Sequence, residues 1–494
     1  MISYKEGDIP VFARRKDIFS LRNDDQIFVP TKNEEQNNYF NLYQQLFSTN
    51  PNIDPQMFCV KLNELTNLIK RSSNFEYKVE LHHAQFFKDI VSLLNLPNKN
   101  VVSSILNFLD QILKFKGPIE AILLETDLVE TMVQIFKEKN QFCNIELNIL
   151  RSLSVSSRCF FDPNAPKSEG LDRIFNQVSI DEIFDVVAKL NDNENHLMKT
   201  FYKFLYSITS FELNSNLQNF ILAVLSEKYD EEEENLYHAM IHILSNMTKY
   251  QTFILPELYN YNLHKFIVDM VNTDSLEHDY ISPALQTISN ICSIKIPDGL
   301  VIPKIQTPIE ERIFNIAGNL NLNEHIRVAA FDALRCMISS IKQFQRFEDS
   351  VLHFLYEKWV LIIEIFDNTS FKIKASIIKL IVQLTISASN LSCYAQNSLF
   401  IQELINRDII RIFVEAIELN DSSLMFQGIL GLKIIIEQCE NYGCEGFFEY
   451  RAKDELNIEL INNIIDHCPD KTTRRQAVFL HSHLVNLPNR LFAE

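Results

Sequence analysis

Two histidines have a spacing that could support metal chemistry. His238 and His242 stand four residues apart, so on a helix both side chains would lie on one face. A zinc site needs at least one more protein ligand, and this pair has neither a nearby third ligand nor the intervening Glu of a metalloprotease motif. We interpret the two residues as ordinary histidines on a helix surface.

Two cysteines form a second pair that could bind a metal. Cys439 and Cys444 flank the sequence Glu-Asn-Tyr-Gly, which is typical of a turn after a helix. A metal site there would need further Cys or His residues at a matching spacing, and only His467 and Cys468 follow. We therefore predict no metal and no other cofactor.

The sequence contains none of the common catalytic motifs. It has no GxGxxG, no GxxxxGK followed by Ser or Thr, no HExxH, no paired CxxC and no GxSxG. The usual signatures of nucleotide-binding loops, zinc hydrolases and serine hydrolases are therefore missing. We predict that the protein is not an enzyme.

Glycine is scarce in this chain. There are 9 glycines among 494 residues, against a usual share of about 7%. Tight hairpins need residues that tolerate positive φ, which glycine supplies most easily, whereas connections between helices can use Asn, Asp and Pro. The hydrophobic share of 46% is ample for a core, but the length exceeds the roughly 250–300 residues of a single core. The sequence indicates an elongated helical array or several helical domains.

Charge and cysteine content narrow the partners and the location. The net charge of −18 argues against nucleic acid, which is bound largely by Lys and Arg. It suits basic protein partners, although solubility alone would explain it equally well. No apolar run reaches the roughly 18–20 residues that cross a bilayer, so we predict no membrane insertion. Nine irregularly spaced cysteines indicate a reducing compartment, and we expect the cytoplasm, the nucleus or both.

A two-part helical pattern recurs along the chain. Its first part is a short apolar run, and successive runs end 35 to 54 residues apart, about 46 on average. This spacing is typical of armadillo and HEAT repeats, at about 40–47 residues. The runs are IVSLL ending at Leu94, MVQIF at Phe136, VVAKL at Leu190, ILAVL at Leu225, IVDMV at Val271, NIAGNL at Leu320, IIEIF at Phe366, FVEAI at Ile417 and INNII at Ile465.

A second helix follows each run after about ten residues. The segment 326–337 represents its pattern best: Ala329 and Ala330 would let neighbouring helices approach closely, and Leu334 would fill the core. One such unit cannot bury its apolar face alone, but stacked units bury a continuous core. We predict an all-α fold, a right-handed α-solenoid (superhelix) of about nine to ten armadillo/HEAT-like repeats over residues 39–494. We expect residues 1–38 to form a flexible arm with a short basic cluster, and residues 162–170 and 295–308 to be surface loops.

The alternating helices resemble the armadillo superfamily, and within it the architecture is similar to importin-α. That resemblance extends to the N-terminal arm, which carries a basic pair, an acidic residue, an apolar residue and Leu-Arg, as in an importin-β-binding arm. It implies that an importin-β-like receptor is bound by Arg14, Arg15, Lys16 and Arg22. The arm is one residue shorter before Leu21-Arg22 than the family pattern, and Asn23, Asp24 and Asp25 replace the further basic residues.

The resemblance also implies a peptide-binding groove along the second helices. In importin-α, a Trp and an Asn four residues later hold the cargo. Here the Trp positions are taken by Asn107, Arg151, Lys203, His242, Gln286, Asp332 and Lys379, and the Asn positions by Gln111, Val155, Ser207, Asn246, Asn290, Cys336 and Gln383. We therefore expect peptide binding at Asn246, Asn290, His242 and Gln286. The single tryptophan, Trp359, falls on a first helix.

Two functions agree with these observations. One is a divergent importin-α-like adaptor in nuclear protein import, which binds a receptor through its arm and cargo in its groove. The other is a regulatory or scaffold subunit of a cytosolic complex, such as one built around a phosphatase, a chaperone or a cytoskeletal factor. Both predict proteins or extended peptides as partners, since function depends on the exposed surface rather than on the fold.

Overall fold

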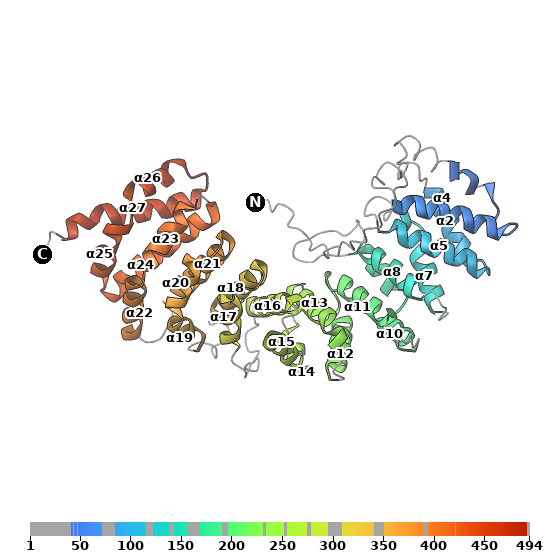
Figure 1. The fold of residues 1–494 in the computed structure, drawn as a ribbon, viewed down its shortest axis with the longest axis horizontal. Coiled ribbons are helices and arrows are strands. Elements are labelled where there is room, and N and C mark those ends of the chain that lie inside the picture. The colour runs from blue at the N-terminus through green and yellow to red at the C-terminus, as the bar shows by residue number, and fades with distance from the viewer. Residues whose placement is uncertain are drawn as a thin grey trace, which may run out of the picture. The chain divides into compact units, whose positions relative to one another are not determined.

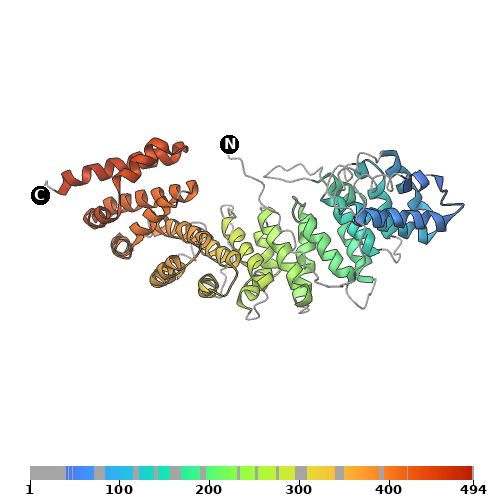
Figure 2. The same cartoon turned by 45° about the horizontal axis from the view of Figure 1, so that its top comes forward.

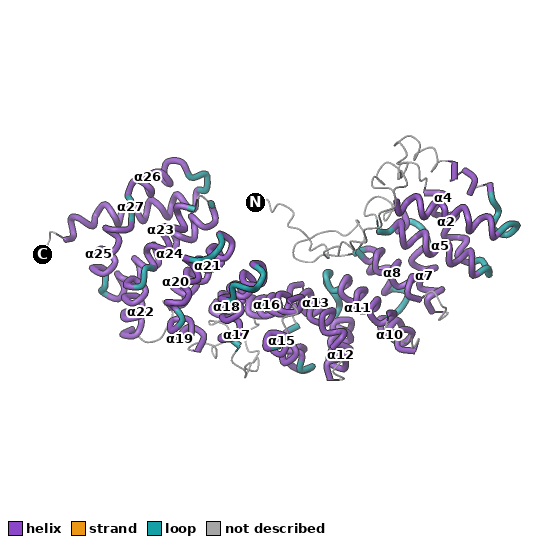
Figure 3. The backbone as a smooth tube through the Cα atoms, in the orientation of Figure 1, coloured by secondary structure: helices purple, strands orange, loops and turns teal. Residues whose placement is uncertain are grey.

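The structure is a computed structural model of the whole chain. It describes residues 41–42, 44–46, 48–71, 84–114, 122–137, 143–155, 168–189, 196–230, 234–250, 254–273, 278–294, 309–339, 350–388, 394–419 and 421–491. The predicted N-terminal arm and the predicted loop 295–308 lie outside these residues. All the described regular elements are helices (Figure 3), so the predicted all-α fold is confirmed.

The chain divides into two compact units. The first comprises the described residues within 1–81 and 96–111, and the second those within 82–95 and 112–494. The first unit holds α2 (Pro55–Arg71) and nearly all of α5 (Lys99–Ile112). In α2 the buried residues Phe58, Leu62, Leu65 and Ile69 recur every three or four positions, which is the apolar stripe of an amphipathic helix.

The second unit is built from helical hairpins, each made of a first and a second helix. It begins with α4 (Ala84–Ser92) and the short turn η1 (Leu93–Asn95). The first helices that follow are α7 (Leu128–Lys137), α10 (Ile180–Lys189), α12 (Ser215–Asp230), α15 (Leu263–Asn272), α17 (Glu310–Gly318), α20 (Trp359–Asp367), α23 (Ile409–Glu418) and α26 (Ile458–His467). Their partners are α8 (Cys143–Ser154), α11 (His196–Ile208), α13 (Glu234–Tyr250), α16 (His278–Ser293), α18 (Glu324–Ser339), α21 (Phe371–Ala388), α24 (Ser422–Tyr442) and α27 (Lys471–Leu491).

Each first helix packs on the second helix that follows it, and consecutive second helices pack on one another from α8 to α27. Figures 1 and 2 show this succession of neighbouring helices within the second unit. Every two-part run predicted between residues 128 and 491 corresponds to one of these hairpins. The two-part pattern of stacked repeats is therefore confirmed.

Several repeats contain a third helix that is shorter than the second helix of the repeat and that the sequence pattern did not predict. These helices precede the first helix of their repeat and are α9 (Glu169–Phe175), α14 (Leu255–Asn260), α19 (Ser350–Glu357), α22 (Tyr394–Asn406) and α25 (Glu445–Glu455). Only a short turn separates α11 from α12, so the α12–α13 repeat has two helices. Units of three helices and of two helices are characteristic of armadillo and HEAT repeats respectively.

The predicted surface loop 162–170 is wrong at its C-terminal end, where a helix begins. Helix α9 begins at Glu169, and Ser168 caps it, because the Ser168 hydroxyl accepts a hydrogen bond from the backbone N–H of Leu171. The same hydroxyl donates to the carbonyl of Ser154, at 2.6 Å. Gly170 lies so close to the Leu153 carbonyl that a Cβ atom would collide with it. The rest of the predicted loop lies outside the described residues.

The core is continuous along the stacked helices of the second unit. As predicted, Ala330 and Leu334 of α18 are fully buried, and α18 packs on both α16 and α21. The Phe413 ring of α23 lies against Gly431 of α24, and both residues are buried. Burial of one such side chain contributes roughly 1.5–3 kcal/mol. No helix among the described residues is both long enough and apolar enough to cross a membrane.

Candidate protein-binding face

Four half-buried rings form a row across three consecutive second helices. The Tyr206 ring of α11 meets the His242 ring of α13 edge to face, with 5.8 Å between ring centroids. His242 lies 4.6 Å from His238 on the same helix, and His238 lies 5.9 Å from Tyr280 of α16. We call Tyr206, His242, His238 and Tyr280 the ring row. It is a polar aromatic surface supported by the buried cores of three helices.

Helix geometry and helix stacking bring these rings together. His238 and His242 are one turn apart on α13, and the predicted common face is confirmed by their ring contact. The tyrosines reach α13 from either side, since α11 and α16 both pack on α13. Edge-to-face contacts at such distances are favourable for aromatic rings, so the row is preorganised before any partner binds.

The two asparagines predicted to bind a peptide lie at equivalent positions of consecutive repeats. The amide of Asn246 donates to the Tyr206 carbonyl, at 3.1 Å, and to the Ser210 hydroxyl, at 3.2 Å. The amide of Asn290 donates to the Ser245 carbonyl, at 3.1 Å, and to the Thr248 hydroxyl, at 3.3 Å. In each case the amide N–H groups bond to the end of the preceding second helix. These contacts join neighbouring repeats.

The other positions aligned with the groove pattern make different contacts. Gln286 is exposed on α16 one turn before Asn290, and His242 belongs to the ring row. On α18, Asp332 pairs with Arg335 at 3.6 Å, and Cys336 accepts a weak hydrogen bond from Ser293, at 3.6 Å. On α21, the Gln383 amide donates to Ser387, at 3.3 Å. Peptide binding at Asn246, Asn290, His242 and Gln286 stays a prediction.

The single tryptophan lies away from this face. Trp359 starts the first helix α20 as expected, is fully buried, and donates its indole N–H to the carbonyl of Arg407 at 3.0 Å. The predicted receptor-binding residues Arg14, Arg15, Lys16 and Arg22 lie outside the described part of the chain. Their role also stays a prediction.

The cysteine pair forms the predicted turn. Helix α24 ends at Tyr442, Gly443 adopts a left-handed conformation at φ 67°, and the N–H of Cys444 bonds to the carbonyl of Cys439 at 2.9 Å. Burial raises the pKa of both thiols, and the pKa of Cys439 rises further because Cys444 lies beside it. Among the described residues no group of three or more His, Cys, Asp or Glu is placed to hold a metal ion.

The tyrosines of the ring row were missed by sequence reasoning. Tyr206 directly precedes the aligned position Ser207, and Tyr280 lies six residues before the aligned position Gln286. Neither falls on the Trp or Asn positions of the family pattern. The one available signal was the His238–His242 spacing, which marks a shared helix face but not the rings that approach it from neighbouring helices.

Two solved structures resemble this chain, and the first of them supports the fold alone. An engineered protein whose crystal structure was solved by the Northeast Structural Genomics Consortium matches with a TM-score of 0.62 at 13% identity, over 91% of this chain and 98% of that chain. A designed armadillo repeat protein matches with a TM-score of 0.40 at 16% identity, over 51% of this chain and 99% of that chain. No family sequence model matches the chain, and no curated protein sequence matches it. The chain has an armadillo/HEAT-like α-solenoid fold.

Proposed function

We propose that this chain is a non-catalytic protein-binding α-solenoid that holds an extended segment of a partner along the ring row. The observation that carries the proposal is the uninterrupted, half-buried row from Tyr206 to Tyr280 across α11, α13 and α16. Rigid, partly exposed aromatic residues supply large contact areas at low entropic cost and are enriched in protein interfaces.

The spacing of the helices suits an extended chain. Packed helices lie about 8–10 Å apart, and an extended peptide advances about 3.3 Å per residue. A bound segment that crosses these helices would therefore meet a new helix about every third residue. The His and Tyr rings could pack on its side chains and hydrogen-bond its backbone at the same time.

Site-specific crosslinking tests this proposal. A photoreactive phenylalanine analogue in place of Tyr206 should crosslink a partner protein in cells, whereas the analogue in place of the exposed Phe371 of α21 should not. The identified partner should then bind the Tyr206→Ala variant at least about tenfold more weakly, as expected when a central interface residue is removed. Equal affinity for Tyr206→Ala, Phe371→Ala and the unaltered chain would refute binding at the ring row.

The narrower role that we propose is a divergent importin-α-like adaptor that shuttles between cytoplasm and nucleus. It is supported by the basic arm around Arg14 and Arg15 and by the stacked repeats. Under this role, the double variant Arg14→Glu, Arg15→Glu abolishes binding to an importin-β-like receptor. Unchanged receptor binding by that variant would eliminate the adaptor role while leaving the protein-binding role intact.

A scaffold subunit is the second candidate, and the asparagine contacts favour it. The amides of Asn246 and Asn290 are bonded to neighbouring helices, and no tryptophan wall accompanies them, so a lysine-rich import signal lacks its usual platform. A scaffold should retain a stable co-purifying partner after deletion of residues 1–38. Loss of every partner on that deletion would contradict the scaffold role.

A further inference from the structure

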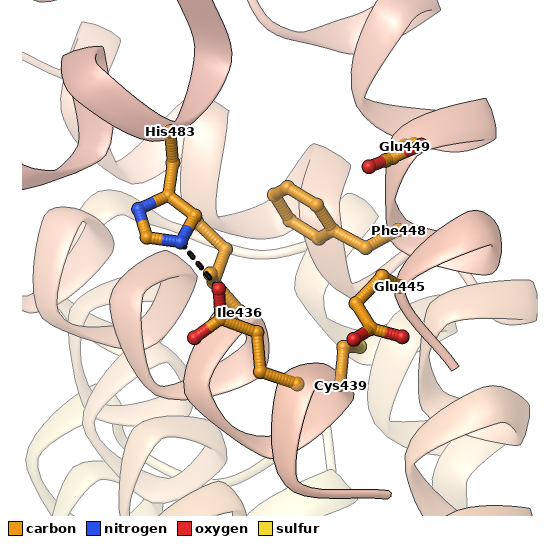
Figure 4. A pocket seen from close by; sticks show the side chains of 7 residues that line it. Ile436, Cys439, Glu445, Phe448, Glu449 and His483 are labelled. Atoms are coloured by element: carbon orange, nitrogen blue, oxygen red, sulfur yellow. Dashed lines mark hydrogen bonds and ion pairs between the residues drawn. The ribbon is translucent and has the colours of Figure 1, made fainter. Parts of the chain in front are cut away.

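A pocket opens between three helices near the C-terminal end of the second unit. Helices α24, α25 and α27 line a pocket that is open to solvent and has a cavity volume of about 20 Å³. Three glutamates line it, together with the Phe448 ring and the His483 imidazole (Figure 4). The pocket is strongly acidic, since it gathers Glu440, Glu445 and Glu449.

Glu449 is the unusual member of this group. Its side chain lies at the pocket wall, and the residue is only 8% exposed. Within the described part of the chain it makes no hydrogen bond or ion pair. A largely buried carboxylate without a partner loses part of its hydration without replacement. The structure therefore leaves a largely buried, unpaired carboxylate beside a space that a cation could enter.

A neighbouring carboxylate adds to the unpaired negative charge at the pocket. Glu445 lies one turn before Glu449 on α25 and lines the same pocket. Like charges four residues apart on a helix repel each other, and neither of these two carboxylates is ion-paired among the described residues. Across the pocket, His483 contacts Glu440 at 2.6 Å, so the imidazole that lines the pocket is already engaged with a different glutamate.

The apolar wall indicates what kind of cation fits. Phe448 lines the pocket between Glu445 and Glu449 and is itself largely buried. An aromatic ring beside carboxylates can pack on the aliphatic stem of a long side chain and attract its charged head. A bare metal ion would instead need several ligands at once, and no such group exists among the described residues.

We propose that this pocket binds the side chain of an arginine or lysine on a partner protein. The cationic head lies between the carboxylates of Glu445 and Glu449, and the stem lies along Phe448. A guanidinium can serve both carboxylates at once because its donors form a planar fork. The proposal rests on the protein-binding role but concerns a different surface from the ring row, so each can fail alone.

Peptide binding to the full-length chain tests the pocket. The probes are three capped, dye-labelled octapeptides of Gly and Ser, whose two central residues are both Arg, both Lys or both Gln. The readout is fluorescence anisotropy. The Arg or Lys peptide should bind and the Gln peptide should not. Glu449→Gln should weaken binding by about tenfold or more, as expected when one partner of a buried charge pair is neutralised.

The control variant is Glu418→Gln, which removes the same charge from an exposed position at the end of α23. It should change peptide affinity by less than about twofold, because screened surface charges contribute little. The half-buried Glu445 provides a second pocket variant, Glu445→Gln, in case Glu449→Gln perturbs folding, which Trp359 fluorescence would reveal.

Three outcomes would overturn the proposal. Equal weakening by the Glu449 and Glu418 variants would mean that only the net charge attracts the peptide. Equal binding of the Gln peptide would show that no cation is recognised. Saturation of the pocket by submillimolar calcium chloride, with no effect of the basic peptides, would assign it to a metal ion. None of these results would bear on Tyr206 or on the ring row.

Discussion

The side-chain amide of Asn290 donates a 3.1 Å hydrogen bond to the backbone carbonyl of Ser245, 45 residues earlier in the chain. Ser245 lies in the last turns of α13, and Asn290 lies in the last turns of α16. The Ser245 carbonyl also accepts a hydrogen bond from the Thr248 hydroxyl of its own helix, at 3.1 Å, so Asn290 adds a contact from the next repeat to the C-terminal part of the previous one. Asn246 repeats the arrangement between α13 and α11.

Replacement of Asn290 by Ala should destabilise the second unit. The change removes donors to Ser245 and Thr248, and the expected loss in free energy of unfolding is about 0.5–1.5 kcal/mol. Chemical denaturation followed by the fluorescence of Trp359, the only tryptophan, measures it. Gln286→Ala, one turn earlier and exposed, should stay within about 0.5 kcal/mol of the unaltered chain. A larger effect at Gln286 than at Asn290 would contradict the proposed repeat contact.

Gly431 should not tolerate a side chain. A Cβ atom there would lie 2.6 Å from Cε1 of the Phe413 ring, and that ring is fully buried. Overpacking of this kind costs typically about 1–3 kcal/mol, so Gly431→Ala should lower the denaturation midpoint.

Gly446 is the matched control in the same region. A Cβ atom on Gly446 of α25 would meet nothing within 4 Å, and alanine favours helix by up to about 1 kcal/mol. Gly446→Ala should therefore be neutral or slightly stabilising. Equal midpoints for the two alanine variants would show that Phe413 can move aside.

Acid should weaken the second unit through His264. Burial lowers its pKa below 6.5, a hydrogen bond to the Leu258 carbonyl opposes that shift, and Lys265 adds to it. The ring stacks on Tyr259 with 4.5 Å between centroids, and Nδ1 has no hydrogen-bond partner within the described ranges. A folded-state pKa below the unfolded value means that the unfolded chain takes up the proton first. Stability should therefore fall as the pH drops from 6.5 toward the lower folded pKa.

The comparison of His264→Gln with the unaltered chain measures this contribution. Glutamine can keep a donor near the position of Nε2 for Leu258 but cannot titrate. Denaturation midpoints at about pH 7.5 and about pH 5.5, on either side of the ordinary histidine pKa, should differ less for the variant than for the unaltered chain. Identical pH dependence would exclude His264 as a source of acid sensitivity.

Cys439 and Cys444 should be inert in the folded protein. Burial raises the pKa of each thiol, and the thiolate is the nucleophile in alkylation. A short iodoacetamide pulse near neutral pH, followed by peptide mass spectrometry, should label the half-buried Cys59 and Cys468 before these two. In guanidinium chloride all four should react alike. Rapid native labelling of Cys439 would show that the turn at Gly443 opens.

The fold could be predicted to a large extent from local periodicity. The run IIEIF identified α20, and the segment that contains Ala330 and Leu334 identified α18, because buried positions recur every three or four residues in any helix that packs on a core. The shortest of the third helices give no such signal. Helix α14 has six residues, less than two turns, so it cannot display a helical period.

The candidate sites, by contrast, could be predicted only in part from local periodicity. The pattern of the sequence identified the shared face of His238 and His242, but Tyr206 and Tyr280 reach them from the helices on either side. Nothing in the sequence distinguishes Glu449 from the other glutamates, and it is buried where α25 packs on α22, α23 and α24. Asn246 and Asn290 were singled out from the sequence, yet their bonding partners depend on the same inter-repeat register.

The sequence by itself therefore determined the class of structure: apolar residues at helical spacing, repeated about every 46 residues, can exclude water only by stacking. The tertiary structure decided which rings, amides and carboxylates meet. That outcome depends on how each helix is rotated and shifted against its neighbour, and a single-helix period contains no information about that offset, because every rotation that buries the apolar stripe satisfies the same pattern.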